Sequence, residues 1–279
     1  VSQGVQDKYE RELERLNNFM VARSKFFPAD MKLDDLVEFR ATWNLLYPSS
    51  LTRQKVQERL RGFLRYCHES GHIEQPLKLK PIRSVSPPTM PLTDAEYDHL
   101  LGAIPKTFEK KPQTIVRVRA LIRLMRHSGL GIRDAVTIER SRIQLDEANK
   151  CYQIVTKRQK SGVHVRVPIP KDVGDEVLAV ANGNPRYVFW SGTSKPTSAV
   201  TNYQHDLRTL FHGSGFPKGH PHQLRDTFAR ALLEKGLSLE NVSKLLGHTS
   251  IKTTEKHYAQ WVIERQRRLT ADVISTWGK

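Results

Sequence analysis

The last third of the chain carries four side chains whose types and spacing suit phosphodiester transesterification. His222 and Arg225 are three residues apart, so they can sit together near the start of one helix. His248 directly follows Gly247, and Tyr258 lies ten residues beyond His248. A tyrosine hydroxyl, with a reference pKa of about 10, is a weak nucleophile unless a neighbour takes its proton or stabilises the phenolate. An arginine would neutralise the charge that develops on the phosphate oxygens in the transition state.

Taken singly, these residues also have structural interpretations. A tyrosine near a tryptophan, as Tyr258 is near Trp261, is typical of packing. Arg225 can pair with Asp226 or with Glu234. The combination of the four residues in this order favours a catalytic site over separate structural roles.

The same chemistry needs a lysine that protonates the leaving 5′ oxygen, and a histidine can take or share the proton of the nucleophile. The chain has a basic turn, KRQKSG, at 157–162. Such a site needs no metal ion. His220 and His222 are a weak metal signal, because they have neither a nearby cysteine nor a helical HExxH spacing. A metal-dependent nuclease would also need a carboxylate cluster, which the sequence does not offer.

Three helices are predicted to position these side chains. Residues 220–236 carry an apolar stripe of Leu224, Phe228 and Leu232 and end at a glycine. Residues 238–248 form a second helix, with Ser238 as its N-cap and Gly247 at its end. A third helix begins after residue 249 and holds the tyrosine.

The N-terminal part is predicted to be helical at 7–24, 32–43 and 49–71. The second of these helices has Leu33, Leu36, Val37 and Phe39 on its apolar stripe. A proline-rich stretch follows, which predicts an extended linker at 85–92 and a boundary near residue 88. Thr93 and Glu96 then match a capping box at the start of a helix.

The second part is predicted to be mixed. Helices are expected at 94–104, 114–128 and 172–183, and a β-pair at 151–156 and 164–170 encloses the basic turn. The fold class is therefore mainly α with a small β-sheet, in two domains: a helical domain at 1–84 and an α+β domain at 93–279.

Charge and composition narrow the function. The 279 residues include 45 Lys and Arg against 29 Asp and Glu, a formal net charge of +16, which favours a polyanionic partner such as nucleic acid. No apolar stretch is long enough for a transmembrane helix, so we expect no membrane partner. Two cysteines without a CxxC motif fit a reducing cytoplasm.

The segments HQLRDTFA, LLGHTS and TTEKHY resemble the catalytic core of the tyrosine recombinase, or phage integrase, family. That family shows H-x-x-R, then L-G-H, then a tyrosine about ten residues on. The resemblance covers essentially the whole chain, because the N-terminal helices resemble the core-binding domain of the family.

Carried over by position, the resemblance makes Tyr258 the nucleophile and His222 with Arg225 the H-x-x-R pair. His248 corresponds to the second histidine, which hydrogen-bonds the scissile phosphate. Lys160 corresponds to the lysine of the β-turn, with Lys157 as its competitor in the same turn.

The chain departs from the family at the first arginine, which usually sits in G-L-R-I-S-[DE]. This chain reads SGLGIRD at 128–134, so Gly131 occupies the arginine position and Asp134 keeps the acidic one. We expect Arg133, two residues later, to reach the phosphate together with Arg225. The alternative is that the first arginine is lost and activity is impaired.

The resemblance implies a site-specific DNA recombinase that acts on double-stranded DNA through a 3′-phosphotyrosyl intermediate, without metal, ATP or other cofactor. It also implies a tetramer on two DNA sites and a cytoplasmic, nucleoid-associated location. The amphipathic segment 262–279 either packs on its own domain or docks into a neighbouring protomer. The alternatives are a type IB topoisomerase-like activity and a DNA-binding protein on a recombinase scaffold.

Overall fold

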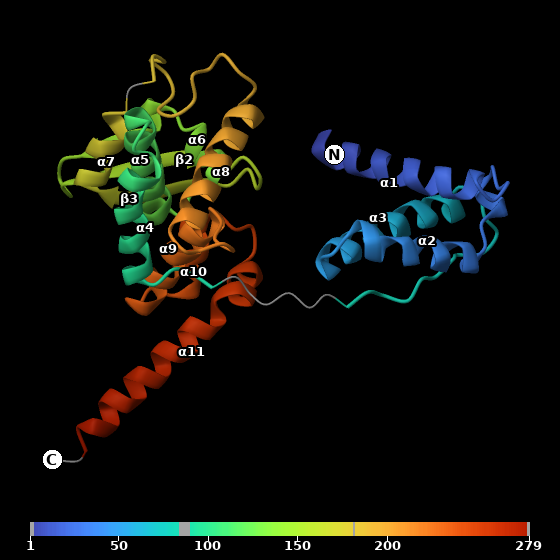
Figure 1. The fold of residues 1–279 in the computed structure, drawn as a ribbon. Helices are drawn as coiled ribbons and strands as arrows, with labels where there is room; N and C mark the ends of the chain where they lie inside the picture. The colour runs from blue at the N-terminus through green and yellow to red at the C-terminus, as the bar shows by residue number, and fades with distance from the viewer. Residues whose placement is uncertain (1–2, 84–89, 181, 278–279) are drawn as a thin grey trace. The chain divides into compact units, whose positions relative to one another are not determined.

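The computed structural model describes residues 3–83, 90–180 and 182–277, and the chain divides into two compact units, Val1–Pro88 and Thr89–Lys279 (Figure 1). Each unit has a hydrophobic core of its own. Most of the predicted linker, residues 85–89, lies outside the described residues. None of the described helices is both long enough and apolar enough to cross a membrane.

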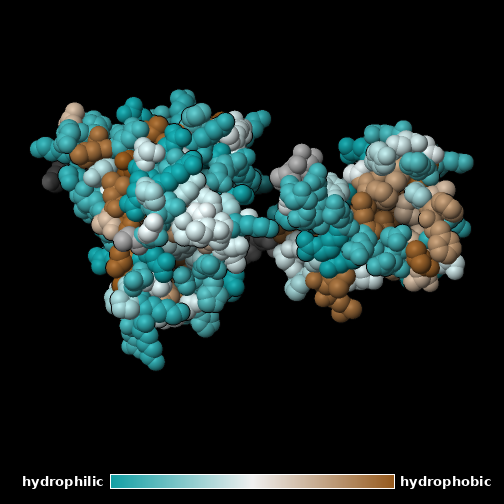
Figure 2. Space-filling view, turned by 90° about the horizontal axis from the view of Figure 1, so that it is seen from above, coloured by the Kyte–Doolittle hydropathy of each residue, from teal (hydrophilic) through white to brown (hydrophobic). Residues whose placement is uncertain are grey.

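The first unit is helical. It consists of α1 (Gln3–Val21), a 3-10 turn (Pro28–Asp30), α2 (Leu33–Leu46) and α3 (Ser50–Glu69). Leu36, Phe39 and Trp43 of α2 are buried in its core, whereas Leu33 and Val37 are exposed, so the apolar stripe predicted for α2 was wrong at those two positions. Other large apolar side chains are also exposed in this unit, and Figure 2 shows apolar residues interrupting its surface.

The chain that leaves α3 is held against the first unit before the described segment ends at residue 83. Leu79 is buried in the core, and its carbonyl accepts a hydrogen bond from Arg61 at 2.6 Å. The carbonyl of Lys80 accepts from Gln57 at 2.7 Å and from Arg40 at 2.8 Å. The first residues of the proline-rich stretch therefore belong to the packed unit.

The second unit combines helices with a three-stranded antiparallel sheet, of which one face is buried. Its elements are α4 (Asp94–Thr107), α5 (Pro112–Ser128), α6 (Ile132–Val136), a 3-10 turn (Arg140–Arg142), β1 (Ile143–Asp146), β2 (Cys151–Lys157), β3 (His164–Pro170), α7 (Lys171–Leu178), α8 (Pro196–Gly213), α9 (His222–Glu234), α10 (Leu239–Leu246) and α11 (Ile251–Ser275). The strand order is β1-β2-β3. The prediction of a mainly helical fold with a small sheet is confirmed.

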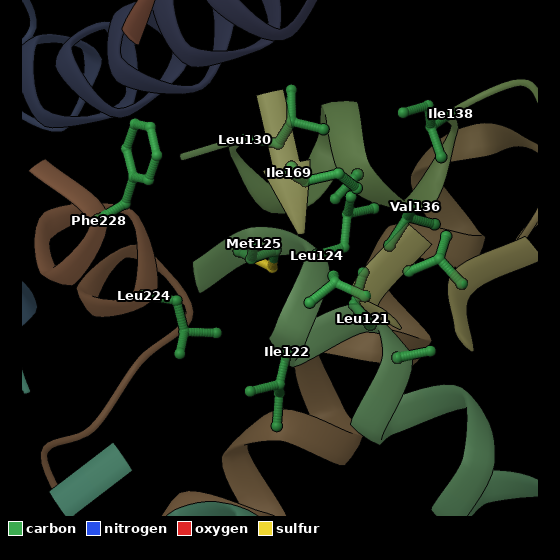
Figure 3. Close-up of a cluster of buried hydrophobic side chains, with 14 of the residues drawn as sticks. Leu121, Ile122, Leu124, Met125, Leu130, Val136, Ile138, Ile169, Leu224 and Phe228 are labelled. Carbon is green, nitrogen blue, oxygen red and sulfur yellow. The ribbon is translucent and has the colours of Figure 1, made fainter. Parts of the chain in front are cut away.

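Helix α5 runs through the centre of this unit. Figure 3 shows its apolar side chains meeting those of the surrounding elements: Leu121, Ile122, Leu124, Met125, Leu130, Val136, Ile138, Ile169, Leu224 and Phe228. Gly129 ends α5 in the left-handed conformation, and a Cβ there would lie 2.4 Å from the Phe228 ring. This close approach brings α9 against the end of α5.

Two caps fix the approach to the site. The Ser238 side chain accepts a hydrogen bond from the Asn241 amide and begins α10, as predicted. Gly247, at φ +69°, ends α10 in the left-handed conformation. Ser250 then caps α11 by accepting from the Lys252 amide. The short connection between α10 and α11 carries His248.

The second half of α11 extends away from the rest of its unit (Figure 1). Tyr258 and Trp261 are buried, but beyond them five large apolar side chains are exposed: Ile263, Leu269, Val273, Ile274 and Trp277. Val262 packs against the core of its own unit, but these five side chains of segment 262–279 do not pack on it. The last two residues, 278–279, lie outside the described range.

Candidate active site

Arg225 lies at the centre of the candidate site, on the first turn of α9 and only 9% exposed. Its Nη1 donates to the carbonyl of Gly129, and its Nη2 donates to the carbonyl of Leu246 at 2.8 Å. These carbonyls end α5 and α10, where the negative end of each helix dipole favours a cation. The ends of two helices thus orient one guanidinium.

His248 is bound directly to this arginine. Arg225 Nη2 lies 3.0 Å from His248 Nε2, and His248 Nδ1 lies 2.8 Å from Thr254 Oγ1. Because a guanidinium nitrogen can only donate, Nε2 accepts and the ring proton is on Nδ1, from which it is donated to Thr254. Burial, together with the charge of Arg225, lowers the pKa of His248 to about 4. The imidazole is therefore neutral at physiological pH.

Tyr258 is 3% exposed and donates a hydrogen bond of 2.5 Å to Oδ1 of Asp226, which is itself buried. Burial, reinforced by the Asp226 carboxylate, raises the pKa of the Tyr258 phenol above its ordinary value, and the charge of Arg225 opposes that rise. The nucleophile candidate is thus held in its protonated form, with a carboxylate in position to receive the proton.

His222 is the first residue of α9, and its side chain is 62% exposed. Its Nε2 lies 3.6 Å from the same Asp226 oxygen that Tyr258 binds. The structure therefore brings four of the expected residues together: Arg225 and His248 in direct contact, and Tyr258 and His222 around Asp226.

The two candidate lysines lie on the β2–β3 hairpin. Lys157 is the last residue of β2 and pairs with His164 across the hairpin, whereas Lys160 lies in the turn. Both side chains are exposed, and neither has a hydrogen bond or ion pair among the described residues. The geometry does not separate them.

Helix α6 holds this hairpin in place. Asp134 Oδ1 accepts a hydrogen bond from the Gln159 amide at 3.1 Å, and the Gln159 side chain donates to Thr137 Oγ1 at 2.6 Å. Arg133 also lies on α6, but its side chain is exposed and makes no hydrogen bond or ion pair with any described residue. It is not brought into contact with Arg225, so its predicted role in phosphate binding stays a prediction.

Three further residues of this site were not expected from the sequence. Arg158, in the basic turn, is 3% exposed and lies close enough to Arg225 for their charges to interact. Asp226 had been weighed only as a partner of Arg225, yet it binds Tyr258. Thr254 is fully buried and binds His248. Two of them could have been found from the sequence: Arg158 lies between the two candidate lysines, and Asp226 directly follows Arg225.

Metal ligation has no support in the described part of the chain, where no three His, Cys, Asp or Glu side chains are grouped as they would need to be to hold an ion. The donors around Tyr258 are an arginine, a neutral histidine and a carboxylate. Cationic and hydrogen-bonding groups of this kind suit the binding of a phosphate.

The sequence of this chain is similar to those of known proteins. The model of the Phage integrase family matches residues 91–264. Tyrosine recombinase XerA of Thermococcus kodakarensis is 25% identical over 259 residues, which cover 91% of this chain and 86% of that protein.

Two solved structures share the fold. One is a lambda integrase dimer bound to a COC′ core site, with a TM-score of 0.70, 18% identity, and coverage of 94% of this chain and 72% of that chain. The other is a post-cleavage complex of the XerH site-specific recombinase bound to a palindromic difH substrate, with a TM-score of 0.70, 20% identity, and coverage of 98% and 80%. At these identities the likeness concerns the fold.

Proposed function

The chain belongs to the phage integrase family, and on that premise we propose that it is a site-specific recombinase that cleaves and rejoins double-stranded DNA through Tyr258. The observation that carries this proposal is the contact network in which Arg225 binds His248 while Tyr258 donates to Asp226 beside them. A nucleophile, a proton acceptor and a buried cation are thereby gathered in one place.

In the proposed first step, Tyr258 Oη attacks the scissile phosphorus and the bond from phosphorus to the 5′ oxygen breaks. The phenolic proton passes to Asp226, which already accepts its hydrogen bond and lies 3.6 Å from His222. The departing 5′ oxygen takes a proton from Lys160, or from Lys157 of the same hairpin. The products are a 3′-phosphotyrosyl linkage and a free 5′-hydroxyl.

Rejoining is the reverse of cleavage. The 5′-hydroxyl of a partner strand attacks the phosphotyrosyl phosphorus, and Tyr258 leaves and regains its proton. The energy of the broken bond is kept in the protein–DNA linkage, so the cycle consumes no ATP. Arg225 stabilises the charge on the non-bridging oxygens in both directions.

The formal charge of +16 supports DNA as the partner, because basic surface attracts the phosphate backbone. We assign DNA binding to the helical domain at 1–84 and catalysis to 93–279, joined by the linker at 85–92. The protein would act on DNA in the cytoplasm, in association with the nucleoid.

Oligomerisation is supported by α11. The five exposed apolar side chains beyond Trp261 lie on a helix that extends from its own unit. We propose that this part of α11 docks into a neighbouring protomer of a tetramer assembled on two DNA sites. Such docking would bury surface that is costly to leave in water.

The test is covalent trapping on a suicide substrate, in which a nick near the cleavage point lets the product fragment diffuse away. The wild-type protein should give an SDS-resistant protein–DNA adduct. Tyr258→Phe removes only the hydroxyl, so it should bind the same DNA and give no adduct. An adduct of wild-type yield in the phenylalanine variant would move the nucleophile elsewhere, and relaxation of plasmid without a specific site would favour a topoisomerase instead.

A further inference from the structure

We propose that Arg158, on the β2–β3 hairpin, supplies the second phosphate-binding guanidinium of the active site. It would replace the first arginine of the family, whose position in the sequence is occupied by Gly131. The inference rests on the proposed function, because it concerns the charge on the scissile phosphate in that reaction. It is carried by three features of Arg158: its unpaired donors, its position beside Arg225, and the elements that hold it there.

The guanidinium of Arg158 is buried, but it has fewer hydrogen-bond acceptors around it than it has donors. Its Nη2 donates to the carbonyl of Leu245 at 3.1 Å, but its Nε and Nη1 are buried and have no hydrogen-bond acceptor. The carboxylate paired with it, Asp134, lies 3.8 Å from Nη1, beyond hydrogen-bond distance. Buried donors without acceptors destabilise a protein, so a structure that keeps two of them suggests a bound acceptor that is present in the working state. Phosphate oxygens match the fork of a guanidinium.

Arg158 and Arg225 are held side by side by one helix end. The carbonyls of Leu245 and Leu246, consecutive residues at the C-terminus of α10, accept from Arg158 Nη2 and Arg225 Nη2 respectively. Burial, and then the charge of Arg225, lowers the pKa of Arg158 to about 9, while Asp134 opposes the shift. Arg158 therefore remains charged at neutral pH, and the two adjacent cations repel each other until an anion binds between them.

The surrounding elements are shaped to hold this side chain. A Cβ on Gly247 would lie 2.7 Å from Arg158 Cγ and 3.2 Å from its Nε, so the glycine leaves the space that the arginine fills. On the other side, α6 binds the hairpin through Asp134 and the Gln159 amide. The turn of the hairpin is closed by Arg158 itself, whose amide donates to the Val163 carbonyl at 2.8 Å.

Arg133 has none of these features. Its side chain is exposed, and within the described ranges it has no partner that would fix its direction. Its neighbour Asp134 faces the hairpin and lies near Arg158. The sequence around Gly131 thus retains the acidic residue next to a guanidinium, while the guanidinium comes from the turn of the β2–β3 hairpin.

All three central groups are covered, since Arg158, Arg225 and Tyr258 are each at most 9% exposed. DNA must therefore displace part of the covering structure before the phosphate reaches them. Lys157 and Lys160, on the same β2–β3 hairpin as Arg158, are exposed.

The test compares Arg158→Ala, Arg158→Lys and Arg133→Ala with the wild-type protein on the suicide substrate, each first shown to be folded and to bind the DNA. Removing a donor to transition-state charge typically costs about 10²–10³ in rate, and we expect that loss for Arg158→Ala. Arg158→Lys keeps the charge but loses the fork, so its loss should be smaller. Arg133→Ala should lose far less than Arg158→Ala.

A second substrate separates phosphate binding from structural support of α10. A methylphosphonate at the scissile position replaces one charged non-bridging oxygen with a methyl group. The loss caused by Arg158→Ala should then shrink at least tenfold, because the charge that Arg158 neutralises is absent. If Arg158 only braces α10, the loss will be the same on both substrates, and the inference is overturned. Arg158→Lys provides the same comparison if the alanine variant does not fold.

The outcomes also separate this inference from the proposed function. If the wild-type protein forms no adduct on any nicked substrate, the proposed function fails, and the role of Arg158 in it fails as well. If the wild-type protein forms the adduct and Arg158→Ala does so at a similar rate, only the inference fails. A larger loss in Arg133→Ala than in Arg158→Ala would return the role to Arg133.

Discussion

Replacing Gly247 with alanine should disturb the active site through Arg158 as well as through the backbone. Gly247 has a φ of +69°, and a non-glycine residue in the left-handed region costs about 1–2 kcal/mol. The new Cβ would also lie 2.7 Å from Arg158 Cγ and 2.8 Å from Val165 Cγ1. Overpacking of this kind typically costs about 1–3 kcal/mol, so the total loss of stability should be roughly 2–5 kcal/mol.

Gly215 provides the matched control. It lies in the same unit with a φ of +85°, but a Cβ there would meet nothing within 4 Å. Gly215→Ala should therefore lose only the backbone contribution, about 1–2 kcal/mol. The difference between the two variants isolates the contact with Arg158 and Val165.

Urea unfolding followed by tryptophan fluorescence measures both changes, because three of the four tryptophans, Trp190, Trp261 and Trp277, lie in the second unit. The midpoint should fall further in Gly247→Ala than in Gly215→Ala, with an unchanged slope. DNA cleavage should follow the same order. Equal stability of the two variants would mean that Arg158 is not packed on the end of α10, and the reasoning about its position would be refuted.

Four further predictions follow from the site. Arg225→Ala should fold, bind DNA and lose about 10²–10³ in cleavage rate on the suicide substrate, and wild-type rates would remove Arg225 from the site. Asp226→Asn should slow cleavage by about 10²–10⁴, since it removes the proton acceptor of Tyr258. Cleavage faster than that of the wild-type protein would show that Asp226 only restrains the tyrosine. Burial lowers the pKa of both His127 and His248 to about 4, so the folded protein keeps them neutral, and its unfolding free energy should fall as the pH drops from about 6.5 towards 4. In His248→Gln the slope of the unfolding free energy against pH should be smaller near pH 5, by the equivalent of about one proton. An unchanged slope would contradict a buried, neutral His248. The affinity for DNA should fall steeply with salt, by nearly one unit of log–log slope for each phosphate contact, and a slope near zero would count against an extensive basic surface.

Local signals explain why much of the fold was predictable from sequence. Helices α9 and α10 have apolar stripes with a period close to that of the α-helix, and Ser238 and Gly247 mark the ends of α10. The β-pair around the basic turn was also predicted, because alternating residues flank a polar turn. Helix α7 was predicted to reach residue 183, but it ends at Leu178.

Strand β1 and helices α6 and α8 were missed for different reasons. Helix α6 has only five residues, Ile132–Val136, so it is too short to show a helical period. Strand β1 has four residues and only Ile143 is buried, so the strand is too short to show a pattern. Helix α8 does carry an apolar stripe with Tyr203, Leu207 and Leu210, but β-branched and polar residues at its start weaken the helical signal. The fold class did not depend on any of these three elements.

The candidate site was only partly predictable, because some of its contacts join residues far apart in the chain. His222, Arg225, His248 and Tyr258 could be found from their spacing along neighbouring helices. The contact of Arg158 with Leu245 joins positions 87 residues apart, and that of Tyr258 with Asp226 joins positions 32 apart. No local pattern records which side chain of a basic turn is drawn into the core.

The paired carbonyls at the end of α10 have a consequence for how such centres evolve. Two adjacent acceptors define where cations sit, and they orient a guanidinium from α9 and one from a β-hairpin in the same way. The acceptors remain fixed while the donors come from different parts of the chain. In the proposed site, the positive charge that Gly131 lacks is supplied from position 158, at a place that the end of α10 defines. A motif that looks broken in the sequence can in this way belong to an intact constellation of charges.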